Sequence, residues 1–230
     1  MRTLGLLGGM SWESTALYYR MINEAVQARL GGLHSAQLAM FSVDFHEIER
    51  LQSDARWEEA GHLLARRAQG LQAAGAEAIV LCTNTMHRVG PAIESALSIP
   101  LLHIADATGD AVRAAGLQRV GLLATRFTME QEFYIGRLRQ THGLDVVVPD
   151  SDDRALVHRI IYSELCQGRV LPESREAFRA VMRRLVAAGT QGVIFGCTEI
   201  TMLVDATDTT VPTFDSTALH AMAAVDWALA

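Results

Sequence analysis

Two short polar segments, each directly after an apolar run, carry the residue types that could do chemistry. Cys82-Thr83-Asn84-Thr85-Met86-His87 follows Ile79-Val80-Leu81, and Cys197-Thr198-Glu199 follows Val193-Ile194-Phe195-Gly196. A thiol can act as a nucleophile, a base or a proton donor. Hydroxyl and amide groups beside a helix start can bind a carboxylate. The two segments therefore indicate acid–base or nucleophilic chemistry on a small anionic molecule.

Cys197 lies where an expected strand ends and an expected helix begins. The free N–H groups and the positive dipole of a helix N-terminus favour a thiolate. Thr198 and Glu199 would form the first turn, and Gly196 would let a ligand approach the backbone closely. The alternative is a buried apolar cysteine that only finishes the strand, and position alone does not separate the two.

Thr83, Asn84 and Thr85 offer several hydrogen-bond donors at the other expected helix start. Ordinary helix capping by Thr83 or Asn84 is the alternative role, and it would leave the remaining side chains available. His87 would lie one turn into the helix, where its position favours a packing role over acid–base chemistry.

Short apolar runs alternate with amphipathic stretches along the chain. The runs are mostly continuous, as in parallel strands covered on both faces, and the alternation is typical of βαβ units. Strands are expected at 3–8, 36–43, 78–82, 101–103, 120–124, 145–148, 192–195 and 211–213. Helices are expected at 12–30, 55–74, 85–97, 108–115, 128–142, 152–167, 173–188 and 216–229.

The chain also resembles itself. Residues 74–83 match residues 188–197, and this alignment places Thr83 opposite Cys197. A slip of one residue would pair Cys82 with Cys197 instead. Successive side chains at a strand end point to different sides, so at most one of Cys82 and Thr83 should face Cys197.

A second match, of Gly5-Leu6-Leu7 with Gly121-Leu122-Leu123, has nearly the same offset. We therefore expect an α/β protein with two pseudo-symmetric Rossmann-like lobes and parallel sheets. Residues 1–98 plus 212–230 would form lobe one, and residues 99–211 would form lobe two. Ligands of open α/β sheets bind at the carboxyl ends of the strands, so both polar segments are expected at an interdomain cleft.

The 20 basic residues are all arginines, and lysine is absent from the 230-residue chain. This excludes enzymes that use a lysine Schiff base, pyridoxal-phosphate enzymes among them, as well as P-loop NTPases and protein kinases. The net charge is −6 without a basic run, so no nucleic-acid partner is expected. Three cysteines do not indicate a disulfide framework. No signal peptide or membrane span is expected, which favours a cytoplasmic protein.

Two further segments bear on cofactors. Gly8-Gly9-Met10-Ser11 is a glycine-rich turn but lacks the G-x-G-x-x-G pattern of dinucleotide sites. Asp44, His46, Glu47 and Glu49 lack recognisable metal-ligand spacing, and a solvated loop is expected there. We therefore predict neither a cofactor nor a metal.

Seven segments, in order, carry a resemblance that covers essentially the whole chain. On these residues the chain resembles the pyridoxal-phosphate-independent aspartate/glutamate racemase family, close to its L-aspartate/glutamate-specific or broad-specificity amino-acid racemase branch. The resemblance implies a homodimer and cofactor-free proton transfer at Cα of an amino acid. The segments are GLLGGMSWEST (5–15), HSAQ (34–37), SVDFHEIE (42–49), LCTNTMH (81–87), LHIADATG (102–109), TMEQEFY (128–134) and GVIFGCTEI (192–200).

The family uses two cysteines, in C-N-T-x-H and G-C-T-E motifs, to exchange the α-proton from opposite faces. Here the first cysteine position is Thr83, and Cys82 lies one residue too early. A hydroxyl is a far weaker base than a thiol. Cys197 is therefore expected to be the principal acid/base, with Thr83 opposite and the two directions of racemisation unequal.

The resemblance also implies substrate contacts. Aspartate-specific members carry a lysine that binds the side-chain carboxylate, and Cys166 takes its place here; Arg50 could supply a cation and Gln52 a polar contact. Asn84, Thr85, Thr125 and Thr198 would hold the α-carboxylate. The complete expected set is Met10, Ser11, Arg50, Gln52, Asn84, Thr85, Thr125, Cys166, Thr198 and Glu199.

Two alternative hypotheses stay open. One keeps the enzyme and changes the reaction, because the same two-lobed superfamily includes hydantoin racemases, maleate isomerases and arylmalonate decarboxylases. A single cysteine suits a decarboxylase as an acid and an isomerase as a nucleophile. The other is a small-molecule binding protein that has lost catalysis. Thr83 favours this second hypothesis, and Cys197 in its G-C-T-E context opposes it.

Overall fold

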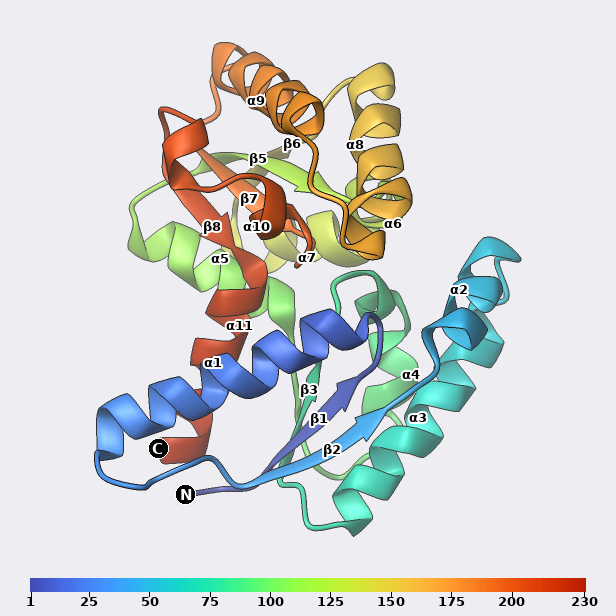
Figure 1. Cartoon of the computed structure of the whole chain (residues 1–230). Helices are drawn as coiled ribbons and strands as arrows, with labels where there is room; N and C mark the ends of the chain where they lie inside the picture. Colours follow the sequence, from blue (N-terminus) through green and yellow to red (C-terminus); the bar gives the residue numbers. More distant parts are fainter. The chain divides into compact units, whose positions relative to one another are not determined.

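The computed structural model describes residues 1–230, which form two compact units. Unit 1 comprises Met1–His103 and His220–Ala230, and unit 2 comprises Ile104–Leu219. Each unit contains one four-stranded parallel sheet (Figure 1), with strand order β2-β1-β3-β4 in unit 1 and β6-β5-β7-β8 in unit 2. The second order repeats the first with every strand number raised by four. The predicted α/β class with two lobes of one design is confirmed.

Each of the expected strands overlaps an observed one. The strands are β1 (Leu4–Gly8), β2 (Leu38–Ser42), β3 (Ala78–Leu81), β4 (Leu101–Leu102), β5 (Arg119–Ala124), β6 (Asp145–Val147), β7 (Gly192–Gly196) and β8 (Thr213–Asp215).

The helices show more departures, since the expected helix at 85–97 is divided in two and that at 128–142 is interrupted. No helix is both long enough and apolar enough to cross a lipid bilayer. The α-helices are α1 (Trp12–Leu30), α2 (Phe45–Ser53), α3 (Trp57–Ala73), α4 (Gly90–Glu94), α5 (Ile104–Ala114), α6 (Arg126–Glu130), α7 (Glu132–His142), α8 (Ser151–Ser163), α9 (Pro172–Ala187), α10 (Ile200–Leu203) and α11 (Ser216–Leu229). Three 3₁₀ helices are η1 (Thr85–Val89), η2 (Leu165–Gln167) and η3 (Ala206–Asp208).

The sheet of unit 1 is covered by helices on both faces. Leu4 and Leu6 of β1 pack on one face, in a cluster with Tyr18 of α1 and Ala224 of α11. Leu7 of the same strand packs on the other face with α2 and α3. Side chains alternate along a strand, so β1 is apolar on both faces, and this explains its continuous apolar run.

One continuous apolar cluster forms the core of unit 2. It joins Leu122 of β5 and Ile194 of β7 to Tyr134 of α7 and Phe178 of α9, all of them buried. In Figure 1, α5 and α7 lie on one face of this sheet, and α8 and α9 lie on the other.

Two strands pair differently from the predicted division of the chain. β4 pairs with β3 and belongs to unit 1, and β8 pairs with β7 and belongs to unit 2. Only the helix after β8, α11, continues into unit 1. β4 and β8 are edge strands of two and three residues, which is too short for an apolar period to assign them to a sheet.

The segment that was expected to be a solvated loop forms α2. The carboxylate of Asp44 caps this helix by accepting from the backbone N–H of His46 at 3.0 Å. Ile48, Leu51 and Gln52 are buried beneath it. The prediction was wrong because the charged outer face of a short amphipathic helix dominates its composition.

Gly8 ends β1 against the first turn of α1, where a side chain does not fit. A Cβ there would lie 2.3 Å from Thr15 Cγ2 and 2.4 Å from Thr15 Oγ1. Thr15 is held in place, because its Oγ1 accepts from Gly9 N at 2.8 Å and donates to Ser11 O at 2.9 Å. Gly8→Ala should therefore lower the free energy of unfolding by about 2 kcal/mol or more, as measured by chemical denaturation.

Gly70→Ala is the matched control. Gly70 lies in α3 with nothing within 4 Å of its Cβ position, and alanine is the better helix former. This change should leave the free energy of unfolding unaltered or raise it by about 0.5–1 kcal/mol. Equal destabilisation by the two substitutions would contradict the steric argument.

Candidate functional site

Two adjacent strands of unit 2 end in candidate site residues. Ala124 ends β5, Gly196 ends β7, and the two residues are partners in the parallel sheet. Thr125 and Cys197 come next, so both stand at the carboxyl edge of this sheet. Both are buried, with 6% and 9% of their surface exposed. The carboxyl edge is where open α/β sheets bind their ligands.

The Cys197 thiol donates a hydrogen bond to a carboxylate. Its Sγ lies 3.0 Å from Oε2 of Glu199. Burial, followed by the negative charge of Glu199 and then by Cys166, raises the pKa of Cys197 well above its ordinary value. Burial acts because a thiolate loses its solvation there. Cys197 is therefore a thiol with a raised pKa that donates to the carboxylate beside it.

The expectation that a helix N-terminus stabilises a Cys197 thiolate is wrong for this structure. α10 begins at Ile200 and has only four residues, so few aligned peptide dipoles act on the sulfur. Glu199 adds a full negative charge at 3.0 Å. The local electrostatics thus favour the thiol over the thiolate.

Thr198 is buried at the same edge and bonded to a residue that the sequence analysis missed. Thr217 Oγ1 donates to Thr198 Oγ1 at 3.3 Å, and the neighbouring Ser216 Oγ donates to Phe195 O at 2.8 Å. Ser216 and Thr217 follow β8 as Cys197 follows β7. This polar pair after a strand was the available signal, and it was obscured because the strand was expected two residues too early.

Thr125 and Cys166 complete the candidates of unit 2. Thr125 precedes α6, and its Oγ1 lies 3.3 Å from Thr128 Oγ1. Cys166, in η2, is partly buried against the core and lies close enough to Cys197 to disfavour its thiolate. Cys166, Cys197 and Glu199 are therefore brought together by the fold of this unit.

Thr83 occupies in unit 1 the position that Cys197 occupies in unit 2. Leu81 of β3 pairs with Leu7 of β1, and the equivalent residue of β7, Phe195, pairs with the equivalent residue of β5. Thr83 and Cys197 each lie two residues beyond these partners. Thr83 is 8% exposed, and its hydroxyl has no hydrogen-bond partner in the structure. That hydroxyl is available to a ligand.

Cys82 is fully buried in an apolar cluster with Leu4, Leu6 and Val80. Its Sγ lies 3.6 Å from the Val80 carbonyl oxygen, and burial raises its pKa. In this structure Cys82 packs in the core of unit 1.

Asn84 and Thr85 are buried beside Thr83, with 5% and 7% of their surface exposed. The side chain of Asn84 does not cap η1, which begins at Thr85. Gln52 reaches this segment from α2, because its Nε2 donates to Met86 Sδ at 2.9 Å. Three of the predicted residues therefore gather around the start of η1.

Met10 and Ser11 follow β1, the strand next to β3. Both are buried. Ser11 caps α1 by accepting from Ser14 N at 3.3 Å, and Ser14 Oγ donates to the Cys82 carbonyl at 3.3 Å. The start of α1 is thereby tied to the end of β3, beside Thr83.

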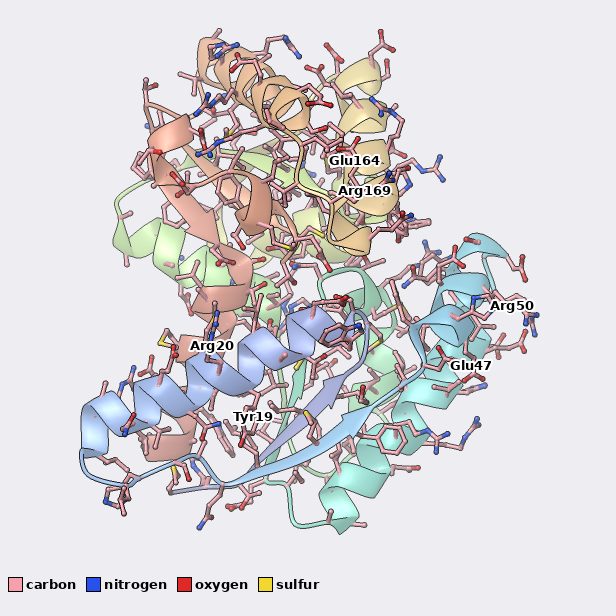
Figure 2. All side chains as sticks on the ribbon, in the orientation of Figure 1. Tyr19, Arg20, Glu47, Arg50, Glu164 and Arg169 are labelled. Atoms are coloured by element: carbon pink, nitrogen blue, oxygen red, sulfur yellow. The ribbon has the colours of Figure 1, made fainter.

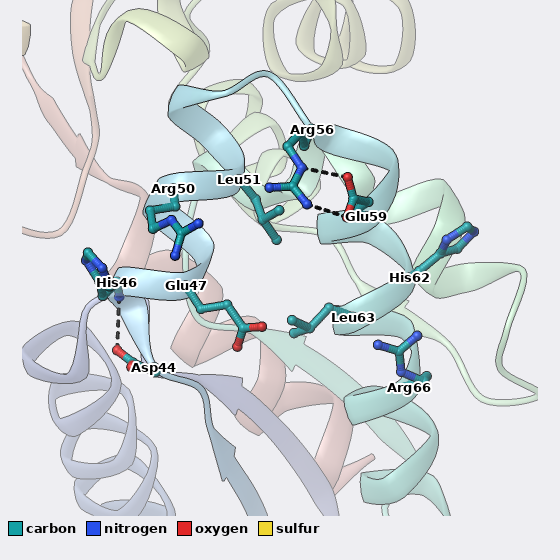
Figure 3. Close-up of a pocket in the computed structure, with 10 residues that line it drawn as sticks. All are labelled: Asp44, His46, Glu47, Arg50, Leu51, Arg56, Glu59, His62, Leu63 and Arg66. Carbon is teal, nitrogen blue, oxygen red and sulfur yellow. Dashed lines mark hydrogen bonds and ion pairs between the residues drawn. The ribbon is translucent and has the colours of Figure 1, made fainter.

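Arg50 lies apart from this group, on the exposed side of α2 (Figure 2). It lines an open groove of about 620 Å³ between α2 and α3 (Figure 3), in which Arg56 and Glu59 form a two-bonded ion pair of 2.6 and 2.7 Å. Arg50 has no ion-pair partner, and no hydrogen bond joins it to the other predicted residues. Asp44 and Glu47 also line the groove, but no three His, Cys, Asp or Glu side chains of the chain are placed so as to hold a metal ion.

The chain is thus an α/β protein of two units with one topology, in which a buried thiol and a buried hydroxyl lie just beyond the ends of equivalent parallel strands. The chain belongs to the Asp/Glu/hydantoin racemase family, whose sequence profile matches residues 7–224. The predicted family is confirmed.

Individual relatives agree with this assignment. The chain is 58% identical to a candidate Asp/Glu racemase from Yersinia pestis, with all of both chains covered and a TM-score of 0.95. It is 32% identical to an aspartate racemase homologue from Pyrococcus horikoshii OT3, again over all of both chains, with a TM-score of 0.87. It is 23% identical to the broad-specificity amino-acid racemase RacX of Bacillus subtilis (strain 168), over 99% of this chain and 98% of that protein.

Glu199→Gln should increase the thiolate fraction of Cys197. The Glu199 charge raises the pKa of Cys197, so a neutral amide should lower that pKa and speed alkylation of Cys197 by iodoacetamide near pH 8. Mass spectrometry of the cysteine peptides measures the alkylation rate at each thiol. Cys82 is the internal control, and its rate should not change. An unchanged or slower rate at Cys197 would show that the carboxylate does not govern this thiol.

Proposed function

We propose that the protein is a cofactor-independent amino-acid racemase in which Cys197 is the principal acid/base and Thr83 acts on the opposite face of Cα. One observation carries the proposal, namely the buried Cys197 thiol that donates to Glu199 at 3.0 Å. Membership of the Asp/Glu/hydantoin racemase family supports the reaction class. The likeness to RacX and to an aspartate racemase homologue supports an amino-acid substrate.

Glu199 accepts the proton that Cys197 must lose before it can act as a base. Since its raised pKa keeps the sulfur protonated, the thiolate forms when the proton moves along the hydrogen bond to Glu199 Oε2. The thiolate then takes the α-proton, and Thr83 Oγ1 gives a proton to the other face of Cα. Solvent returns a proton to Thr83 while Glu199 releases one. The substrate is inverted and the enzyme is restored.

The substrate itself assists the first of these steps. An amino acid carries an ammonium group on the reacting carbon, and a cation within about 4–6 Å of a titrating group favours the anionic form of that group. Binding therefore lowers the pKa of Cys197. The thiol becomes an effective base only when a substrate is present.

Neutral donors hold the α-carboxylate in this proposal. Thr125, Thr198, Asn84 and Thr85 are buried at the strand ends and offer hydroxyl and amide hydrogens. The other proposed substrate contacts are Met10, Ser11, Gln52 and Cys166. Arg50 lies apart from these residues, on the exposed side of α2, and is not among them.

Cys197→Ser should strongly slow exchange of the α-proton. Each enantiomer of a panel of amino acids is incubated in deuterated buffer, and loss of the Cα proton is followed by NMR. The wild-type protein should exchange at least one amino acid, and Cys197→Ser should lower that rate by about a hundredfold or more, because a hydroxyl is the weaker base. Cys82→Ala is the matched control and should keep most of the rate, since Cys82 packs in the core.

Other outcomes separate the alternatives. No exchange for any amino acid, with wild type equal to Cys197→Ser, would overturn the proposal, and tight binding without exchange would then indicate a binding protein. Loss of activity in Cys82→Ala equal to that in Cys197→Ser would show that the wrong residue of unit 1 was chosen. Carbon dioxide release from a malonate, or a covalent Cys197 adduct, would indicate a decarboxylase or an isomerase.

Thr83→Cys should speed the slower direction of racemisation, because a thiol is a better base than a hydroxyl. The two enantiomers have equal free energies in an achiral solvent, so kcat/KM must be the same in both directions, and the inequality shows in kcat and KM separately. We expect the smaller kcat to rise by about tenfold and the two kcat values to approach each other, as measured by polarimetry. A fall of both values would contradict a proton-transfer role for Thr83.

A further inference from the structure

Three buried histidines of unit 1 lie together and have no part in the proton transfers above. His87, His103 and His220 are 1%, 9% and 0% exposed. The ring centroid of His87 lies 4.5 Å from that of His103 and 5.8 Å from that of His220. Such a cluster needs defined hydrogen bonds, because buried imidazole nitrogens are costly to leave unpaired.

The bonds of His220 fix its tautomer. Its Nε2 lies 2.8 Å from the carbonyl oxygen of Leu102, which can only accept, so Nε2 carries the proton. In the neutral ring its Nδ1 accepts from the buried hydroxyl of Tyr18, which lies 2.9 Å away. His220 thus ties α11 to the end of β4 and to α1.

Two of these histidines stand where the chain passes between the units. Unit 1 ends at His103 and resumes at His220. His220 holds Leu102, the residue before His103, and both rings pack on His87. The two points at which the chain leaves and re-enters unit 1, called the chain crossings below, therefore lie in one cluster of histidines.

His87 connects this cluster to Thr83. Its Nδ1 donates to the Thr83 carbonyl oxygen at 2.7 Å, while Thr83 N donates to Leu81 O at 2.8 Å. The equivalent carbonyl of unit 2, that of Cys197, accepts from the backbone of Ile200 at 3.2 Å. The donor to this carbonyl is thus a side chain in unit 1 and a main-chain N–H in unit 2.

We propose that His87 is a positioning residue that fixes the peptide carrying Thr83, and that His103 and His220 hold it at the two chain crossings. The inference rests on the proposed role of Thr83 in racemisation. Without the imidazole, the buried Thr83 carbonyl loses its donor, and the peptide turns to find another. A misplacement of a reacting group by about 1 Å can cost about a hundredfold in rate.

The test compares two substitutions at His87 with a control elsewhere. Asparagine places an amide N–H near the position of Nδ1, so His87→Asn keeps the donor to Thr83, whereas His87→Leu removes it. His142→Leu is the control, because His142 is also buried and bonded, to Asp106 at 3.1 Å, but lies in unit 2. Thermal unfolding checks that each variant is folded.

The readout is deuterium exchange into each enantiomer separately. One enantiomer presents its α-proton to Cys197, which can remove the proton and return a deuteron to the same face without Thr83. This Cys197-facing enantiomer is the one that Thr83→Ala still exchanges. His87→Leu should lower exchange of the Thr83-facing enantiomer by about tenfold or more, and exchange of the Cys197-facing enantiomer by less than about threefold. His87→Asn should restore exchange of the Thr83-facing enantiomer to within about threefold of wild type. His142→Leu should leave the ratio of the two rates unchanged.

The outcomes are distinguishable. If the wild-type protein exchanges no amino acid, the proposed function fails and the role of His87 falls with it. If the wild type exchanges but His87→Leu slows both enantiomers equally, His87 is only structural. His87→Asn as slow as His87→Leu, or His87→Leu at wild-type rates, would likewise overturn the inference.

Discussion

The inner strands of both sheets are buried on both faces, and this constraint decides where polar chemistry can lie. Every residue of β1, β3 and β7 is buried, as are all but the first of β5. A polar side chain within these strands would be desolvated without a partner. The site residues therefore begin just beyond the strands, where turns and helix starts offer backbone groups and neighbouring hydroxyls. The parallel arrangement collects them at one edge of each sheet.

The two units share a topology but use it unequally. At equivalent positions beyond the strands, unit 2 carries a thiol that donates to a carboxylate, and unit 1 carries a hydroxyl without a partner. The carbonyl of Cys197 is satisfied by the main chain, whereas that of Thr83 depends on His87. The repeat thus fixes where the two groups stand, and the surrounding side chains decide how each one can act.

The sequence predicted most of the elements and the positions of the polar segments, because continuous apolar runs report parallel strands directly. The internal repeat also selected Thr83, and the pairing of β3 and β7 with their neighbours is consistent with that choice. The pairing of the edge strands and the contacts between side chains were harder to predict. Edge strands as short as β8 do not reveal their sheet or their exact end. β8 was expected to end two residues too early, so Ser216 and Thr217 were not predicted. The sequence alone did not show that Glu199 would turn back onto Cys197 and reverse the expected effect of the helix start.

The chain has no lysine, and no other cationic side chain acts on Cys197 in its place. No cationic side chain lowers the pKa of this thiol, while burial and Glu199 raise it. In the proposed racemisation, the compensating positive charge arrives with the substrate. An α-ammonium group would supply it at the carbon whose proton is removed, whereas a malonate or another dianion would add to the negative charge around Glu199. For the proposed reaction, electrostatics thus favour an amino acid over a dicarboxylate. They do so through the pKa of Cys197, independently of which side chain the substrate carries.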